Sequence, residues 1–328
     1  MRRMARADLL IKLVIAGKSG DSKLFQQTVE ALIAEERSKQ HHVLADRLAD
    51  SLRATTPTKQ SSSFINDGVR NFVHETLPNR LLDDLILSDT ILEACNELIE
   101  EQHRSELLRS YNLEPRNRIL LTGPPGNGKT SLAEAVATSL MVPMYSIRYE
   151  GVIGSYLGET ASRLNKMFDY IRSRKCVLFF DEFDAIGKER GDEHETGEIK
   201  RVVSSLLLQF DQLPSHVVVI VATNHPELLD RAVWRRFQLR LMLSKPERLQ
   251  IEEWIKRFQK RFDQPLGHSP KILSERLAGL SFAEIEEFGL DIQRRYVLSM
   301  PASNLKTIIR DRLRQWEAKY KLNSDESE

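Results

Sequence analysis

The stretch Gly123-Pro124-Pro125-Gly126-Asn127-Gly128-Lys129-Thr130 matches the pattern G-x-x-x-x-G-K-[ST] at every fixed position and directly follows an apolar segment. In such a loop, glycines let backbone N–H groups converge on phosphate oxygens, because a side chain would block positive φ and close approach. Lys129 supplies a positive charge and Thr130 a hydroxyl for Mg²⁺. The helix that continues through Ser131 directs its positive dipole end at the same place. These residues predict a loop that binds the phosphates of ATP. The alternative is a glycine-rich turn between a strand and a helix.

The composition is that of a soluble globular protein. With 328 residues, 41% of them hydrophobic, the chain has room for two or three domains and enough apolar side chains for a core. Its 48 basic and 47 acidic residues nearly cancel, which argues against a partner bound mainly by bulk charge, such as duplex DNA or an anionic membrane. The two cysteines form no disulfide framework, and no apolar run is long enough to span a bilayer. We therefore expect a cytoplasmic protein without a membrane partner.

Residues 1–53 predict a small helical domain, because three groups of apolar residues recur there at helical spacing. Such a domain serves either packing and oligomerisation or the recognition of a client or partner. Residues 54–75 are polar and lack periodicity, and they predict a linker.

Strand-like and helix-like segments alternate between residues 76 and 245. Largely apolar segments of strand length occur at 119–121, 143–148, 177–180, 217–221 and 239–243. Continuous runs such as those at 177–180 and 217–221 are typical of strands buried on both faces. The alternation predicts an α/β fold of the P-loop NTPase class, with a parallel sheet covered by helices on both faces. Residues 246–322 contain only helical patterns and predict a small helical lid domain. An acidic tail at 323–328 follows, which we expect to be disordered.

Asp181 and Glu182 end the apolar segment 177–180 with two adjacent carboxylates. Because side chains alternate along an extended chain, the two carboxylates point in different directions and can take different roles. We expect Asp181 to belong to the Mg²⁺ shell and Glu182 to orient and deprotonate the attacking water. The alternative is an acidic strand end at the protein surface.

Further polar groups follow later strands. Asn224 comes directly after a strand, at the carboxyl edge where such sheets bind ligands, which suits a hydrogen bond to the γ-phosphate or to the attacking water. Arg235 and Arg236 lie beyond it, and an arginine commonly stabilises charge on a transferred phosphoryl group. The alternative for this arginine pair is a solvated basic turn.

In this order and spacing, residues 123–130, Asp181-Glu182, Asn224 and Arg235-Arg236 resemble the AAA family of ATPases over about residues 81–296. The resemblance implies Mg²⁺-dependent ATP hydrolysis, with Asn224 as the first sensor. It also implies that Arg235 and Arg236 are arginine fingers that reach the ATP of a neighbouring subunit, and hence a ring, most often a homo-hexamer. The doubled arginine resembles the arginine pair of the family branch that severs microtubules and disassembles membrane complexes.

The segment Ser281-Phe-Ala-Glu284 stands where the family usually has Ser-Gly-Ala-Asp near the adenine. Phe282 in place of glycine is a departure from the family pattern. It leaves Ala283 and the backbone of residues 85–87 as candidates for adenine contacts. No arginine of this domain stands out in the sequence as a further sensor.

Ser155-Tyr156-Leu157-Gly158-Glu159 resembles the first pore loop of the family, in which an aromatic and an aliphatic residue grip an extended polypeptide. By this resemblance Tyr156 and Leu157 would hold substrate, and residues 189–197 would form the second pore loop. An aromatic ring suits that task because it makes apolar contact with any sequence. The alternatives are that Tyr156 packs beneath its own loop and that residues 189–197 form an ordinary surface loop.

The resemblance implies a ring motor that uses ATP hydrolysis to thread, unfold or disassemble a protein client, with a separate protease or adaptor left open as a partner. A second hypothesis is an ATPase that loads or remodels nucleic acid. Balanced charge and the aromatic loop argue against it. A third is a nucleotide-gated oligomeric scaffold, against which the presence of Glu182 argues. The sequence does not define the client.

Overall fold

The structure is a computed structural model, and it describes Lys12 and residues 28–33, 73–147, 157–184, 205–301 and 304–325. Of these, the side chains of residues 157–163, 232 and 317–325 are not described. The chain divides into two compact units, Met1–Asn66 and Asp67–Glu328, so the division falls inside the expected linker. In the first unit residues 28–33 are helical, with Val29 and Ile33 buried. The rest of the expected N-terminal domain lies outside the described residues.

In the described part of the second unit, six strands form one sheet in the order β1-β3-β4-β5-β2-β6. All neighbouring pairs among β2 to β6 are parallel, as expected for an α/β fold of the P-loop class. The strands are β1 (Val73–Thr76), β2 (Arg118–Thr122), β3 (Met144–Ile147), β4 (Cys176–Phe180), β5 (Val217–Thr223) and β6 (Leu239–Met242).

The edge strand β1 differs from the expectation, because it pairs antiparallel with β3 and makes the sheet mixed. It occupies residues that the sequence assigned to the linker, so the sheet begins three residues before the expected domain boundary at 76. Its sequence, VHET, is short, with three polar residues of four, and it shows no apolar run. An edge strand of this kind leaves no periodic signal, which is why sequence reasoning missed it.

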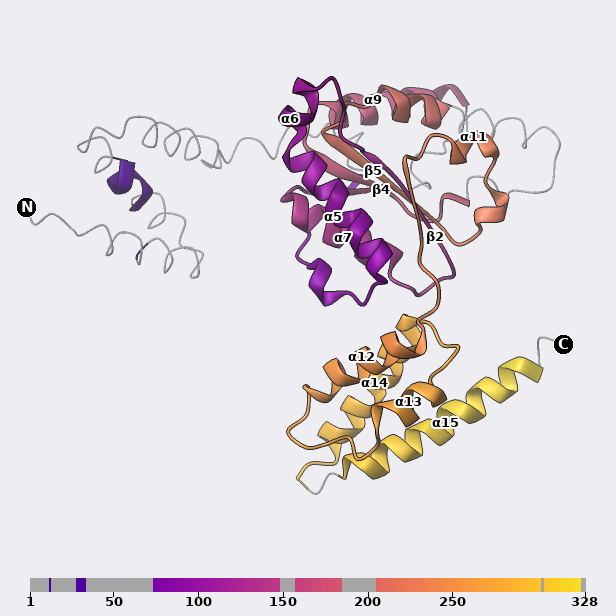
Figure 1. Cartoon of the computed structure of the whole chain (residues 1–328). Coiled ribbons are helices and arrows are strands. Elements are labelled where there is room, and N and C mark those ends of the chain that lie inside the picture. The colour runs from indigo at the N-terminus through magenta and orange to yellow at the C-terminus, as the bar shows by residue number, and fades with distance from the viewer. Residues whose placement is uncertain are drawn as a thin grey trace, which may run out of the picture. The chain divides into compact units, whose positions relative to one another are not determined.

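Helices cover both faces of the sheet (Figure 1). On one face lie α5 (Asp89–His103) and α7 (Lys129–Leu140), and on the other lie α9 (Leu157–Arg172) and the helical residues 205–212. Strand β2 shows the division, since Ile119 and Leu121 pack with α5 and α7 while Leu120 belongs to the opposite core. The connecting segments include η2 (Leu82–Asp84), α6 (Ser105–Ser110), η4 (Pro226–Leu228) and α11 (Arg231–Trp234).

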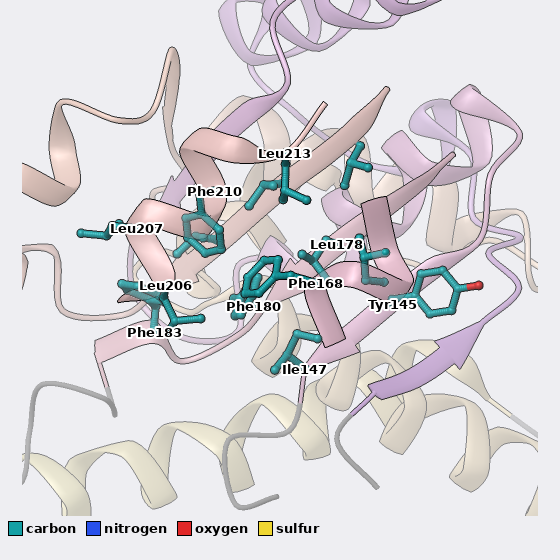
Figure 2. Close-up of a cluster of buried hydrophobic side chains, with 14 of the residues drawn as sticks. Tyr145, Ile147, Phe168, Leu178, Phe180, Phe183, Leu206, Leu207, Phe210 and Leu213 are labelled. Atoms are coloured by element: carbon teal, nitrogen blue, oxygen red, sulfur yellow. The ribbon is translucent and has the colours of Figure 1, made fainter. Parts of the chain in front are cut away.

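Aromatic rings fill the core on the α9 face (Figure 2). The ring of Phe210 makes edge-to-face contacts with Phe168, Phe180 and Phe237, at centroid distances of 6.1, 5.0 and 6.4 Å. Phe180 is the last residue of β4, so this packing holds the strand end that carries Asp181. Truncating such a ring to alanine costs about 3–5 kcal/mol of stability.

A separate helical core follows the sheet, as the sequence predicted. It is built by α12 (Arg248–Gln259), α13 (Pro270–Arg276), α14 (Phe282–Leu298) and α15 (Leu305–Asp325). Trp254 and Phe258 of α12 stack with ring centroids 4.8 Å apart, and Gly289 of α14 fits beneath them because a Cβ there would lie 2.7 Å from Trp254. None of the helices in the described ranges combines the length and apolar character needed to cross a membrane.

The last helix extends further than expected. Helix α15 continues to Asp325, so residues 323–325 of the expected disordered tail are helical. Its earlier turns are anchored in the core by Leu305, Ile309 and Leu313. Once a helix is anchored in this way, each added residue gains a backbone hydrogen bond at low cost, so the helix propagates into polar sequence.

Candidate functional site

The phosphate loop joins β2 to α7 at the carboxyl edge of the sheet, and close packing fixes two of its glycines. A Cβ at Gly123, where φ is 131°, would lie 2.1 Å from the carbonyl oxygen of Leu243. At Gly126, where φ is 75°, a Cβ would lie 3.0 Å from the Oγ of Ser281. The glycines are therefore needed for contact with the chain that follows β6 and with the start of α14, and not only for close approach of a phosphate.

Lys129 is buried at the start of α7, and its ammonium is surrounded by oxygens. The Nζ donates to the carbonyl oxygens of Gly123 at 2.7 Å and Pro124 at 3.1 Å, and to Oδ1 of Asn224 at 2.6 Å. Burial lowers the pKa of Lys129, and the nearby Asp181 and Asp184 carboxylates oppose that shift. The structure thus brings together two residues predicted for catalysis, Lys129 and Asn224, and holds the charge of Lys129 over the loop.

Thr130 and Asp181 also meet, although they are 51 residues apart in the chain. The Oγ1 of Thr130 donates to Oδ2 of Asp181 at 2.9 Å. A hydroxyl and a carboxylate are hard oxygen ligands of the kind that Mg²⁺ prefers. This pair fits Mg²⁺ chemistry, and these are the residues of the chain that would hold the ion.

Glu182 adopts a backbone conformation that is uncommon for a residue with a side chain. Its φ is 49°, in the left-handed region, and its N–H donates to Oδ1 of the preceding Asp181 at 2.9 Å. Such a conformation costs of order 1 kcal/mol or more and is found preferentially at functional sites. The exposed Glu182 lines the same cavity as Lys129 and Asp181.

Asp184 is a residue that sequence reasoning missed. It is 6% exposed, and its Oδ1 accepts hydrogen bonds from Oγ1 of Thr223 at 2.8 Å and from the backbone N–H of Asn224 at 3.3 Å. The buried carboxylate thereby fixes the end of β5 from which Asn224 reaches Lys129. A signal was present, since Asp184 follows the carboxyl end of β4, Thr223 is the last residue of β5, and these parallel strands are neighbours.

Lys129, Thr130, Asp181, Glu182 and Asn224 line one cavity of about 740 Å³. Most of the predicted ATP-binding residues line it, and it also includes the predicted base contacts Ala283 and residues 85–87. The lining residues that had been predicted from the motifs are Pro125, Gly126, Asn127, Gly128, Lys129, Thr130, Ser131, Asp181, Glu182, Asn224 and Ala283. The size and the mixed lining suit a nucleotide with its phosphates at the loop.

Much of the remaining wall was not predicted from the sequence. Trp254 and Phe258 line it from α12, and the indole Nε1 of Trp254 donates to Glu286 at 2.9 Å. Arg80 lines the opposite side, where its Nη1 donates to the Oγ of Ser131 at 2.9 Å. These residues lie far from the motifs in the sequence, and only the aromatic spacing of α12 hinted at a shared face.

The arginine pair is not among the described residues that line the cavity. Arg235 is exposed, and Arg236 is half-buried with its Nε donating to Oδ2 of Asp211 at 3.0 Å. Asp211 also pairs with Arg118, the first residue of β2. Arg236 therefore lies near the opposite end of β2 from the phosphate loop.

Two predicted substrate contacts lie outside the structural description. Tyr156 is not among the described residues, and Leu157 begins α9 without a described side chain. The expected second pore loop at 189–197 also lies outside the described residues.

Comparison with known proteins agrees with this geometry. The family model described as "ATPase family associated with various cellular activities (AAA)" matches residues 119–245. An uncharacterized AAA family ATPase, y4kL, of Sinorhizobium fredii is 37% identical over 291 residues, which cover 86% of this chain and 87% of the relative.

Two other relatives match over shorter stretches. A putative 26S proteasome regulatory subunit homolog of Methanothermobacter thermautotrophicus is 31% identical over 225 residues, 66% of this chain and 60% of that protein. The peroxisomal ATPase PEX6 of Saccharomyces cerevisiae is 34% identical over 178 residues, 52% of this chain and 17% of that protein.

The mostly parallel sheet, the phosphate loop and the paired Thr130 and Asp181 define a P-loop nucleoside triphosphatase with a further helical part. The similarity along most of both chains then gives the family: the protein belongs to the AAA family of ATPases. Family membership implies that it binds and hydrolyses ATP.

Proposed function

We propose that the protein is a Mg²⁺-dependent ATPase that assembles into a homo-hexameric ring and threads protein clients through a central pore. The observation that carries the enzymatic part is the convergence of Lys129, Asn224, Thr130, Asp181 and Glu182 on one cavity. The relatives named as a proteasome regulatory subunit homolog and a peroxisomal ATPase support the use of that activity on proteins.

The arrangement supports a division of labour in hydrolysis. Lys129 holds phosphate oxygens by charge, and Asn224 is placed beside it to orient the γ-phosphate or the attacking water. Glu182 accepts the proton of that water as the oxygen attacks phosphorus and the bond to ADP breaks. Mg²⁺ held by Thr130 and Asp181 neutralises charge on the phosphates when bound.

The ring is supported by the position of Arg235 and Arg236. Neither residue lines the cavity of its own chain. Arg236 shares the Asp211 carboxylate with Arg118, the first residue of β2. Strand β2 is five residues long, so Arg118 lies roughly 15 Å from the phosphate loop at the other end of the strand. That gap exceeds the reach of an arginine side chain. We infer that both act on the nucleotide of a neighbouring copy, where an arginine stabilises the charge of the transferred phosphoryl group.

Client handling is proposed for Tyr156 and Leu157, and client recognition for the N-terminal residues 1–53. An adaptor or a separate protease remains compatible with this function. The client is proposed to be a polypeptide rather than nucleic acid, because basic and acidic residues balance over the chain.

Steady-state ATP hydrolysis at ring-forming concentrations, with and without an unfolded polypeptide, tests this function. We expect the polypeptide to stimulate the wild type several-fold and Tyr156→Phe similarly, and Tyr156→Ala to lose the stimulation while keeping basal turnover. The matched control is Tyr111→Ala, which removes a tyrosine that is 73% exposed beyond α6. Stimulation that survives Tyr156→Ala, or stimulation by DNA instead of polypeptide, would contradict the threading function.

A further inference from the structure

The first turn of α14 is bonded to the phosphate loop. The backbone N–H of Ala283 donates to the carbonyl oxygen of Gly126 at 2.9 Å. The N–H of the preceding Phe282 donates to the side-chain Oδ1 of Asn127 at 3.3 Å, across 155 residues of sequence. The loop that would hold phosphates thus also holds the lid domain.

These two donors are available because the cap of α14 serves other groups. The N–H of Glu284 donates to the Oγ of Ser281 at 3.3 Å, and Oε2 of Glu284 accepts from the N–H of Ser281 at 2.6 Å. The first N–H groups of a helix have no partner within the helix. Here the loop satisfies the amides of Phe282 and Ala283, so the contact is part of how α14 begins.

Asn127 joins the two parts with a single buried amide. It is 4% exposed, and its Nδ2 donates to the carbonyl oxygens of Pro124 at 3.1 Å and Pro125 at 3.3 Å. One end of the side chain therefore closes the loop on itself while the other end binds α14. A change in the curvature of the loop must move or break the bond to Phe282.

The phosphate loop and α14 are in close contact at Gly126. A Cβ on Gly126 would lie 3.0 Å from the Cβ of Ala283 and 3.0 Å from the Oγ of Ser281. Loop and helix are packed as closely as a glycine permits, and packed elements transmit displacement rather than absorb it.

We propose that Asn127 is a positioning residue that couples the phosphate loop to the lid, so that nucleotide in the loop sets the position of α14. This inference rests on ATP binding at the proposed site. Coupling between two sites typically amounts to 5–150-fold in affinity, and a pair of hydrogen bonds lies within that scale. By reciprocity, a lid that cannot bond to the loop weakens nucleotide binding.

A test must distinguish the effect of the Phe282 ring from the effect of the Phe282 backbone N–H. The ring lines both the nucleotide cavity and a neighbouring cavity of about 340 Å³, so its removal has effects of its own. Phe282 is the first residue of α14, and Ser281 before it has φ −75° and ψ 162°. Proline is favoured at the first position of a helix and after a residue in the extended conformation, and it has no backbone N–H. Phe282→Pro therefore removes the donor with little strain, and Phe282→Ala is the matched control that keeps it.

The first measurement is a double-mutant cycle on ADP affinity, with Phe282→Ala as the reference background. We expect Phe282→Pro to bind ADP about 5–20-fold more weakly than Phe282→Ala. Asn127→Ala also removes the bonds from its Nδ2 to the loop, so it should weaken binding in both backgrounds. The loss should be smaller in the Phe282→Pro background, because the bond to Phe282 is already absent there. Independent, additive effects would overturn the coupling.

The second measurement is the distance between spin labels on Arg104→Cys, at the end of α5, and Lys271→Cys, on α13. The native Cys95 and Cys176 are both buried and would not be labelled. We expect ADP to change this distance in the wild type and in Phe282→Ala, and to change it by less than half as much in Phe282→Pro at saturating ADP. Equal changes in all three proteins would overturn the proposal, whereas a wild type that fails to bind ADP would instead overturn the proposed ATPase.

Discussion

The phosphate loop and the arginine pair are both predicted parts of one hydrolytic site, but the chain treats them differently. Lys129 and Thr130 are joined by hydrogen bonds to residues at the ends of β5 and β4, Asn224 and Asp181. Arg236 instead bonds Asp211 beside the start of β2. One half of the site is joined by hydrogen bonds within the chain, whereas Arg236 bonds Asp211, which does not line the nucleotide cavity.

This difference indicates what each half depends on. Nucleotide binding needs only one folded chain, because its donors already converge. Hydrolysis by the proposed mechanism also needs a second copy, because the arginines lie too far from their own cavity. The two halves should therefore respond differently to substitution and to mixing of subunits.

The largest effect is expected from Lys129→Ala. It removes the charge of the phosphate site and the donor to Asn224 Oδ1 and the Gly123 carbonyl, whereas the Pro124 carbonyl still accepts from Asn127. Two charge-assisted hydrogen bonds lost to phosphate amount to about 3–6 kcal/mol, so ATP affinity should fall at least about 100-fold. Titration with a fluorescent ATP analogue measures this, with Lys271→Ala on the exposed surface of α13 as control. Near-normal affinity would refute the assigned role of Lys129.

Glu182→Gln should separate binding from hydrolysis. The amide cannot accept the proton of the attacking water, so turnover should fall by about 10²–10⁴-fold. ATP affinity should stay close to that of the wild type, and the protein should accumulate in its ATP-bound, assembled form. Single-turnover hydrolysis and sedimentation in ATP check both parts, and turnover close to wild type would remove Glu182 as the base.

Arg236→Ala tests the proposed arginine finger. It should bind ATP normally yet hydrolyse it about 10³-fold more slowly, the lower end of the range for an arginine finger. Mixing it with Lys129→Ala subunits should restore part of the activity. A Lys129→Ala subunit still offers Arg236 to a neighbour whose loop is intact.

The control for that experiment is Arg104→Ala, which removes an arginine whose side chain is 65% exposed and paired only with Glu100 among the contacts described. It should hydrolyse ATP normally without added subunits. If mixed Arg236→Ala and Lys129→Ala subunits regain no activity, the arginine does not act across an interface.

The smallest effect is expected from Asp211→Asn. It weakens ion pairs to Arg236 and Arg118, whose side chains are 32% and 23% exposed. Partly exposed pairs contribute about 1 kcal/mol or less, so turnover should fall only about 3–10-fold with ATP affinity unchanged. Asp169→Asn, which removes an aspartate 69% exposed on α9, is the control. Equal turnover in the two variants would mean that Asp211 does not position Arg236.

Much of the fold followed from local pattern. Runs rich in Val, Ile and Phe marked β4 and β5, because strands buried on both faces must be apolar along their whole length. The edge strand β6 instead alternates between buried and exposed residues. Ser281 and Glu284 stand at the spacing of a capping box, and the structure has that box at the start of α14. Strand β1 was missed because three of its four residues are polar, and it is a strand only because β3 offers an unpaired edge.

The sequence by itself determined the phosphate loop, because its eight residues are consecutive and their chemistry is that of backbone N–H groups, one charge and a helix end. It also determined the strand-end carboxylates and the AAA family. Only the tertiary structure decided which residues far apart in the sequence form hydrogen bonds with each other. Lys129 meets Asn224 across 95 residues and Thr130 meets Asp181 across 51. Such bonds require two groups to lie about 3 Å apart, and that distance is set by which strands are neighbours, β4 beside β5 and β5 beside β2.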